Sequence, residues 1–286
     1  TVGANIVQNG DFSELGSDLV VNGDFDNGLT NWSNPIYGGN NSASLSIDNG
    51  ALKIEKNADL DWRSSFVSQS PISYVSGKTY EIKFSLKDGT TNGSDVYIRS
   101  QYDISGSDVS QKTLTSEWVE YTEYYVANSN SDDISFGCVD WQNSGSGEYY
   151  FIDNVSVKQV DPNDDWDTAS GAGASVTIKD GRVDIITNGD AAELKQTNIF
   201  EVTKRYQVTV DAIINSGAGV KVGDSTDDDS IMDISSTGVY TAIFVATGED
   251  FEIGREGGSA SNSTINSVSI KEITQSDHGG LVIGAT

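Results

Sequence analysis

Large apolar residues alternate with polar ones along several short runs of this chain. The clearest runs cover residues 51–55, 80–86, 96–102, 206–212 and 239–245. A period of two is typical of strands that bury one face and expose the other. Clusters of Gly, Asn, Asp and Ser separate the runs, and these residues favour tight turns. The pattern therefore predicts an all-β protein made of antiparallel sandwiches or barrels.

Five sequence blocks occur twice in the same order. Residues 31–32 match 165–166, 46–54 match 177–185, 78–86 match 204–212, 117–127 match 237–246, and 152–160 match 265–273. One matching strand could arise by chance, but five ordered blocks indicate duplication. We predict two tandem antiparallel β-sandwich domains, the first at residues 17–160 and a shorter, degenerate copy at 161–273, with a short linker near Pro162.

A shorter motif is also repeated near the start of the chain. Asn5-Ile-Val-Gln-Asn-Gly-Asp-Phe12 recurs as Asp18-Leu-Val-Val-Asn-Gly-Asp-Phe25, and the second occurrence leads into the first domain. The alignment of the five blocks requires neither residues 1–16 nor residues 274–286. We therefore predict an N-terminal arm at 1–16 and a C-terminal tail at 274–286.

Charge and residue usage exclude several functions. Asp and Glu number 43 against 17 Lys and Arg, which gives a net charge of −26. Such a surface disfavours nucleic acid and anionic membrane surfaces as partners, because both are bound through Lys and Arg. No apolar run is long enough for a membrane-spanning helix, so membrane insertion is not expected. A single Cys and a single His argue against a disulfide, a Cys-rich metal site and a Ser-His-Asp triad.

Two motifs resemble family-4/9-type carbohydrate-binding modules, a superfamily of jelly rolls. These are the opening Asp18-Leu-Val-Val-Asn-Gly-Asp-Phe-Asp-Asn-Gly-Leu-Thr-Asn-Trp-Ser33 and the closing Tyr149-Tyr-Phe-Ile-Asp-Asn-Val-Ser-Val157, with Gly77-Lys-Thr-Tyr-Glu-Ile-Lys-Phe84 between them. The resemblance covers residues 18–160. The second copy looks like the small sandwich repeats of bacteriophage virion proteins, as do residues 14–25. The resemblance implies two tandem antiparallel jelly-roll β-sandwich domains, each of two sheets, with a glycan bound on a concave face of one sheet.

Sugar binding requires flat aromatic faces beside hydrogen-bonding groups. The second copy carries no comparable aromatic row, and we expect no sugar site there. Trp62 and Trp141 could instead pack at a rim, and Tyr97 with Arg99 could be a solvated cation–π pair. In the first copy the candidate glycan-binding residues are Trp62, Arg63, Tyr97, Arg99, Gln101 and Trp141.

The same resemblance implies a structural Ca²⁺ ion where the opening and closing strands meet. Asp26 and Asp153 match the positions of its ligands. Paired carboxylates suit calcium, although two solvated acids are the simpler interpretation.

These features favour a non-catalytic extracellular or virion surface protein, structural and adhesive, with a glycan-binding face on the first domain. The alternative is a pair of carbohydrate-binding modules from a secreted polysaccharide-degrading enzyme. A glycosidase is a third hypothesis, because that chemistry needs only two carboxylates. We also expect self-assembly through the chain's end segments. Asn5-Ile-Val-Gln8 and Gly279-Gly-Leu-Val-Ile-Gly-Ala-Thr286 could each add a strand to the sheet edge of a neighbouring subunit.

Overall fold

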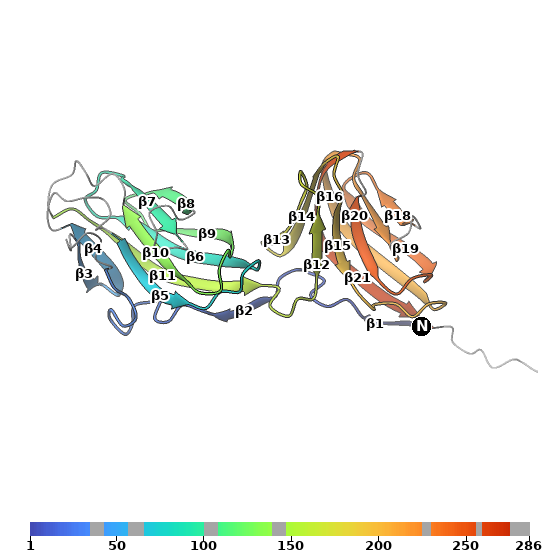
Figure 1. Cartoon of the computed structure of the whole chain (residues 1–286), viewed down its shortest axis with the longest axis horizontal. Coiled ribbons are helices and arrows are strands. Elements are labelled where there is room, and N and C mark those ends of the chain that lie inside the picture. Colours follow the sequence, from blue (N-terminus) through green and yellow to red (C-terminus); the bar gives the residue numbers. More distant parts are fainter. Residues whose placement is uncertain are drawn as a thin grey trace, which may run out of the picture. The chain divides into compact units, whose positions relative to one another are not determined.

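The computed structural model describes residues 1–34, 43–56, 66–99, 108–138, 147–224, 230–255 and 259–274. For Asp108 and Cys138 it describes the backbone alone. The regular elements within these ranges are all β-strands (Figure 1). Their pairings are antiparallel, as the alternating pattern predicts. The chain forms two compact units. Leu15–Val160 make up the inserted unit, and Thr1–Glu14 together with the chain from Asp161 onward make up the outer unit.

The inserted unit is a sandwich of two sheets. The first sheet has the order β3 (Ala43–Asp48), β4 (Ala51–Lys56), β11 (Tyr149–Val160), β6 (Thr79–Asp88) and β9 (Val119–Val126), and β2 (Leu15–Asp18) also pairs with β11. The second sheet has the order β5 (Phe66–Ile72), β10 (Asp132–Cys138), β7 (Asp95–Arg99) and β8 (Asp108–Thr113). The apolar residues of each alternating run point between the sheets. Phe84, Ile98 and Phe136 are fully buried there, and the Trp32 ring packs against Phe136 in the same core.

The outer unit repeats this arrangement. One sheet has the order β13 (Ser175–Lys179), β14 (Arg182–Asn188), β21 (Ala260–Ile273), β16 (Arg205–Gly217) and β19 (Gly238–Val245), and β1 (Val2–Asn5) pairs with β21. The other has the order β12 (Asp167–Ser170), β15 (Ala192–Gln196), β20 (Phe251–Arg255), β17 (Val220–Gly223) and β18 (Ser230–Ile234). The duplication of sequence is therefore a duplication of topology.

Residues 1–14 are part of the outer sandwich and not a separate arm. The rings of Phe12 and Trp166 lie 5.2 Å apart, and those of Phe25 and Trp32 lie 5.3 Å apart. The indole N–H of Trp166 donates to the carbonyl of Asn9, as that of Trp32 donates to the carbonyl of Asn22. Each Asn-Gly-Asp-Phe motif thus begins one sandwich. Residues 9–12 begin the outer sandwich, and residues 22–25 begin the inserted one.

This arrangement corrects the domain division made from sequence. That division treated each sandwich as one continuous segment, so it assigned the first motif to neither domain. In the fold, the whole inserted unit lies in sequence between Phe12 and Trp166. The expectation that residues 5–8 add to a neighbouring subunit is also corrected, because β1 pairs with β21 of its own chain, and Ile6 N–H donates to the carbonyl of Ile270.

A close backbone approach explains why both motifs contain glycine. A Cβ atom on Gly10 would lie 2.4 Å from the carbonyl oxygen of Val268, and one on Gly23 would lie 1.9 Å from that of Val155. These distances are far below van der Waals contact, so any side chain would push the opening motif off its closing strand. The glycines therefore fix where each motif can dock.

Candidate functional site

The outward face of the sheet β5-β10-β7-β8 carries the candidate glycan-binding residues that the structure describes. Val96 and Ile98 of β7 point into the core and are fully buried, so Tyr97 and Arg99 point to the opposite face. Strand register places four residues in one row across the sheet. The row consists of Phe66, Gly137, Tyr97 and Gln111.

Arg99 lies between two aromatic rings on this face. Its guanidinium carbon is 5.2 Å from the centre of the Phe66 ring and 5.5 Å from that of Tyr97. Arg99 and Phe66 are only 8% and 5% exposed, whereas Tyr97 is half-buried. The ring of Phe66 lies over Gly137, because a Cβ atom there would sit 2.4 Å from two ring carbons. The rings and the guanidinium are therefore held in place by the sheet before any ligand binds.

Hydrogen-bonding groups flank the rings on β8. The amide nitrogen of Gln111 donates to one carboxylate oxygen of Asp95, and Thr113 Oγ1 donates to the other at 2.6 Å. Because Gln111 is paired in register with Tyr97, this contact holds an exposed amide next to the Tyr97 ring. An aromatic face with an amide and a guanidinium beside it has the chemistry that pyranose rings require.

Of the six predicted glycan-binding residues, the structure brings Tyr97 and Arg99 together. Trp62, Arg63, Gln101 and Trp141 lie outside the described residues and remain predictions. The prediction missed Phe66 and Gln111. The alternating pattern of residues 66–69 could have predicted that Phe66 lies on the sheet face opposite to that of the buried Val67. Only the pairing of β5 with β10 and of β10 with β7 places Phe66 two strands from Tyr97.

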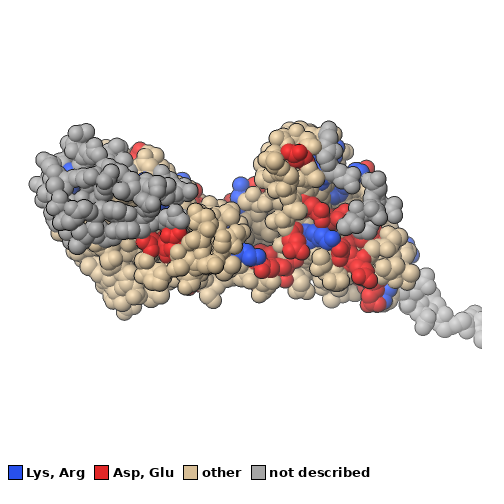
Figure 2. Space-filling model, in the orientation of Figure 1, with Lys and Arg blue, Asp and Glu red and all other residues tan. Residues whose placement is uncertain are grey.

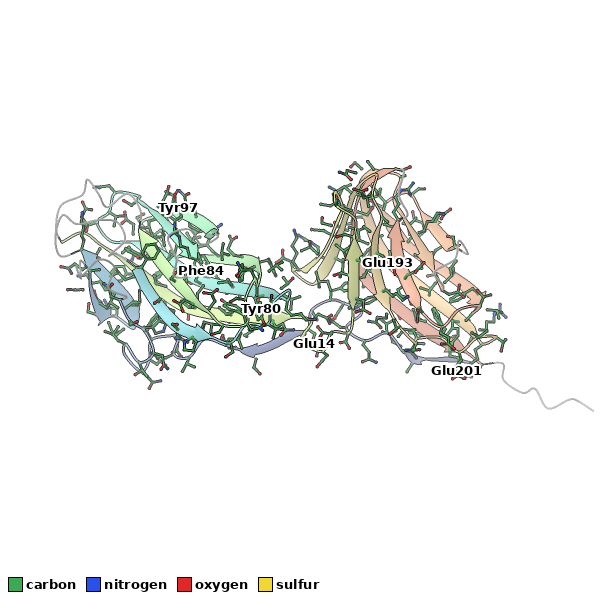
Figure 3. All side chains as sticks on the ribbon, viewed as in Figure 1. Glu14, Tyr80, Phe84, Tyr97, Glu193 and Glu201 are labelled. Atoms are coloured by element: carbon green, nitrogen blue, oxygen red, sulfur yellow. The ribbon has the colours of Figure 1, made fainter. Side chains whose placement is uncertain are left out.

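The matching face of the outer unit is charged instead of aromatic. Lys221 of β17 takes the place of Tyr97, in register with Gly254 and Glu193. Beside them, Lys195 Nζ lies 2.7 Å from an Asp250 carboxylate oxygen. This hydrogen bond raises the pKa of Lys195 and lowers that of Asp250. Figure 2 shows basic and acidic side chains mixed on the visible side of this unit, and Figure 3 marks Glu193 there and Tyr97 on the inserted unit.

The candidate calcium ligands lie where the opening turn meets β11. Val155 N–H donates to the carbonyl of Gly23, next to an irregularity in β11 after Asp153. Burial raises the pKa of Asp153 above its ordinary value of 3.8, and the nearby negative charges of Asp24 and Asp26 raise it further, whereas a hydrogen bond from Asn154 N–H opposes the shift. A partly buried carboxylate in the field of other negative charges is one that a hard cation would stabilise. The calcium site at Asp26 and Asp153 remains a prediction.

A second acidic cluster lies in the outer unit. Glu14, Asp161 and Asp165 place carboxylate oxygens within 4.8 Å of one another. Burial, a hydrogen bond to Asp165 and the charges of Asp165 and Asp161 raise the pKa of Glu14 (Figure 3). Both carboxylate oxygens of Asp161 accept protein hydrogen bonds, from the Asn9 side chain at 2.9 Å and from Trp166 N–H at 3.0 Å. Asp161 thus links the opening motif to Trp166, which directly precedes β12.

Comparisons with known proteins give similarity at the level of solved structures. No family model and no curated protein matches the chain. The tandem family 22 carbohydrate-binding modules of Xyn10C from Paenibacillus barcinonensis match at 10% identity and a TM-score of 0.39, covering 91% of this chain and 99% of that one.

Two single modules match part of the chain. A family 4 carbohydrate-binding module matches at 23% identity and a TM-score of 0.36, covering 54% of this chain and 99% of that one. A mutant of the family 29 module CBM29-2 matches at 20% identity and a TM-score of 0.32, covering 45% of this chain and 81% of that one. All three TM-scores are below 0.5, too low to assign a function to this chain.

Proposed function

We propose that the inserted unit binds a glycan on the outward face of β5-β10-β7-β8. The observation that carries this proposal is the position of the Arg99 guanidinium between the rings of Phe66 and Tyr97. The half-buried Tyr97 ring offers apolar surface to the C–H side of a pyranose, and Gln111 offers an amide to its hydroxyl groups. Trp62, Arg63, Gln101 and Trp141 are the predicted further contacts.

The charge of the chain favours a neutral or weakly charged glycan. A net charge of −26 repels polyanions at long range, and Arg99 supplies a positive charge at the centre of the face. Because Arg99 is already packed between rings, we expect it to orient hydroxyl groups more than to neutralise a charged sugar.

The wider role that we infer is that of a non-catalytic extracellular or virion surface protein with structural and adhesive functions. A pair of modules from a secreted polysaccharide-degrading enzyme is the second candidate. The scarcity of His and Cys in the chain is consistent with both. Among the described residues, no helix is long and apolar enough to cross a membrane. Neighbouring genes for structural virion proteins would favour the first role, and a catalytic domain beside these units would favour the second.

The test of glycan binding is a glycan array probed with the intact protein, followed by titration calorimetry on any glycan retained. We expect neutral or weakly charged polysaccharides to bind and highly sulfated ones to fail. Binding of no glycan, or of polyanions alone, would remove the proposal. Addition of a chelator in a parallel experiment separates loss of binding from loss of a structural cation.

We also propose that Asp26 and Asp153 hold a structural Ca²⁺ ion in the inserted unit, where the opening turn meets β11. The outer unit has Asn266 in place of Asp153 and Ser13 in place of Asp26. Calcium at about 100 times its dissociation constant should therefore stabilise the inserted unit by about 2.7 kcal/mol, and more than it stabilises the outer unit. Replacement of Asp153 by Asn should abolish this effect, and in chelator it should stabilise the unit, because it removes a partly buried charge.

The pH dependence of the calcium effect follows from the raised pKa of Asp153. Since the cation binds the carboxylate, its stabilisation should be complete above that pKa and decline as the pH falls through it. In chelator the sign reverses, because protonation removes the cost of the buried charge and the unit gains stability as the pH falls. Thermal melts across pH, with calcium and with chelator, measure both effects, and Asn266→Asp serves as the matched control. Curves that coincide in calcium and chelator would exclude the site.

A further inference from the structure

Among the described residues, no strand pairs with the free side of the edge strand β19 of the outer unit. This edge strand has eight residues, Gly238–Val245, and none is charged. Val239, Ile243 and Val245 are 67%, 52% and 54% exposed and share one face of the strand. An edge strand presents unpaired backbone groups on its free side, and proteins usually blunt it with charges, proline or a covering segment.

The matching edge strand of the inserted unit shows the usual protection. β9 carries Glu120 and Glu123, and Glu123 points toward the other sheet, where it pairs with Lys112. Inward-pointing charge of this kind discourages pairing with a further strand. β9 and β19 occupy the same position in the two copies of the repeat. The absence of charge is therefore specific to β19 and is not common to both edges.

A segment with matching character follows the last described residue, Thr274. Residues 279–286 read Gly-Gly-Leu-Val-Ile-Gly-Ala-Thr and carry no charge, in a chain in which 21% of residues are charged. A second copy of the chain is a less favourable occupant, because each copy carries a net charge of −26 and repels the other.

Strand register shows that this segment can reach the free side of β19. Glu272 near the end of β21 pairs with Tyr206, and Tyr206 pairs with Phe244 near the end of β19. β21 and β19 both run antiparallel to β16, so they end at the same end of the sheet (Figure 1). A strand added to the free side of β19 lies three strand spacings from β21, about 14 Å. Residues 275–279 can span about 16 Å, and a chain that reverses there runs antiparallel to β19.

We propose that residues 280–286 add to β19 of their own chain as a further antiparallel strand. This pairing satisfies the free backbone groups of β19 and covers Val239, Ile243 and Val245 at least in part. A tether of five residues gives the segment an effective concentration of about millimolar at its own sheet edge. That concentration favours the intramolecular contact over exchange between copies in dilute solution.

The test is hydrogen exchange of the intact protein measured by mass spectrometry. Successive residues of a strand point their N–H groups to opposite sides, so either Val282 or Ile283 donates its N–H to β19. Because proline has no N–H, one of the two variants Val282→Pro and Ile283→Pro removes a hydrogen bond to β19 in either register. We expect amides of β19 to exchange about tenfold faster in at least one of these variants than in wild type. Ser276→Pro, in the tether, is the matched control, and amides of the distant edge strand β13 report on the rest of the unit.

Two results would overturn the proposal. The first is equal exchange of β19 in wild type and in both proline variants. The second is protection of β19 that rises with protein concentration together with dimer formation in sedimentation, because the covering strand would then come from another copy. Protection that is independent of concentration and lost in a strand variant supports the intramolecular pairing.

Discussion

Phe12→Ala will destabilise the outer unit and leave the inserted unit unchanged, whereas Phe25→Ala will do the reverse. Both side chains are almost completely buried and each packs on the tryptophan of a different sandwich. Removal of a buried Phe side chain costs about 3–5 kcal/mol. The two residues belong to nearly identical motifs close together in the sequence, so opposite effects can come only from the tertiary structure.

Hydrogen exchange resolved by peptide measures the two units separately in the intact chain. In Phe12→Ala we expect faster exchange in β14, β16 and β21 and wild-type exchange in β6 and β11. Phe25→Ala is the matched control, and we expect the opposite result for it: faster exchange in β6 and β11 and wild-type exchange in β14, β16 and β21. A Phe12→Ala protein whose outer unit exchanges like wild type would show that residues 1–14 are dispensable, as the sequence interpretation of an arm implies.

Tyr97→Ala will abolish most glycan binding without unfolding the inserted unit. Tyr97 is half-buried and points away from the core, so its removal leaves no cavity between the sheets. An aromatic side chain at the centre of a binding face contributes about 2 kcal/mol or more, which weakens binding more than about tenfold. Arg99→Lys should also weaken binding, because it keeps the charge but loses the planar group that packs between the Phe66 and Tyr97 rings.

Lys221→Ala provides the matched control, since Lys221 occupies the position of Tyr97 in the outer unit. Titration calorimetry with a glycan found on the array should give wild-type affinity for Lys221→Ala and a large loss for Tyr97→Ala. Equal affinity of Tyr97→Ala and wild type would place the binding site elsewhere. A loss in Lys221→Ala alone would move it to the outer unit.

Much of the fold was predictable from local pattern. The period-two alternation of residues such as Val96, Tyr97, Ile98 and Arg99 determines which side chains a strand buries, because successive side chains point to opposite faces. Burial of the apolar set then requires two facing sheets. This is why both the sandwich class and the shared outward face of Tyr97 and Arg99 could be predicted from sequence alone.

The pairing of distant segments was decided only by the tertiary structure. Asn9-Gly-Asp-Phe12 and Asn22-Gly-Asp-Phe25 have the same local chemistry, so neither motif by itself determines on which closing strand it docks. The choice depends on the docking of Gly10 against Val268 and of Gly23 against Val155, contacts between segments more than a hundred residues apart. The position of Phe66 beside Arg99 is likewise set by the register of β5, β10 and β7. Register is a property of the assembled sheet, since it depends on partners that a strand does not encode by itself.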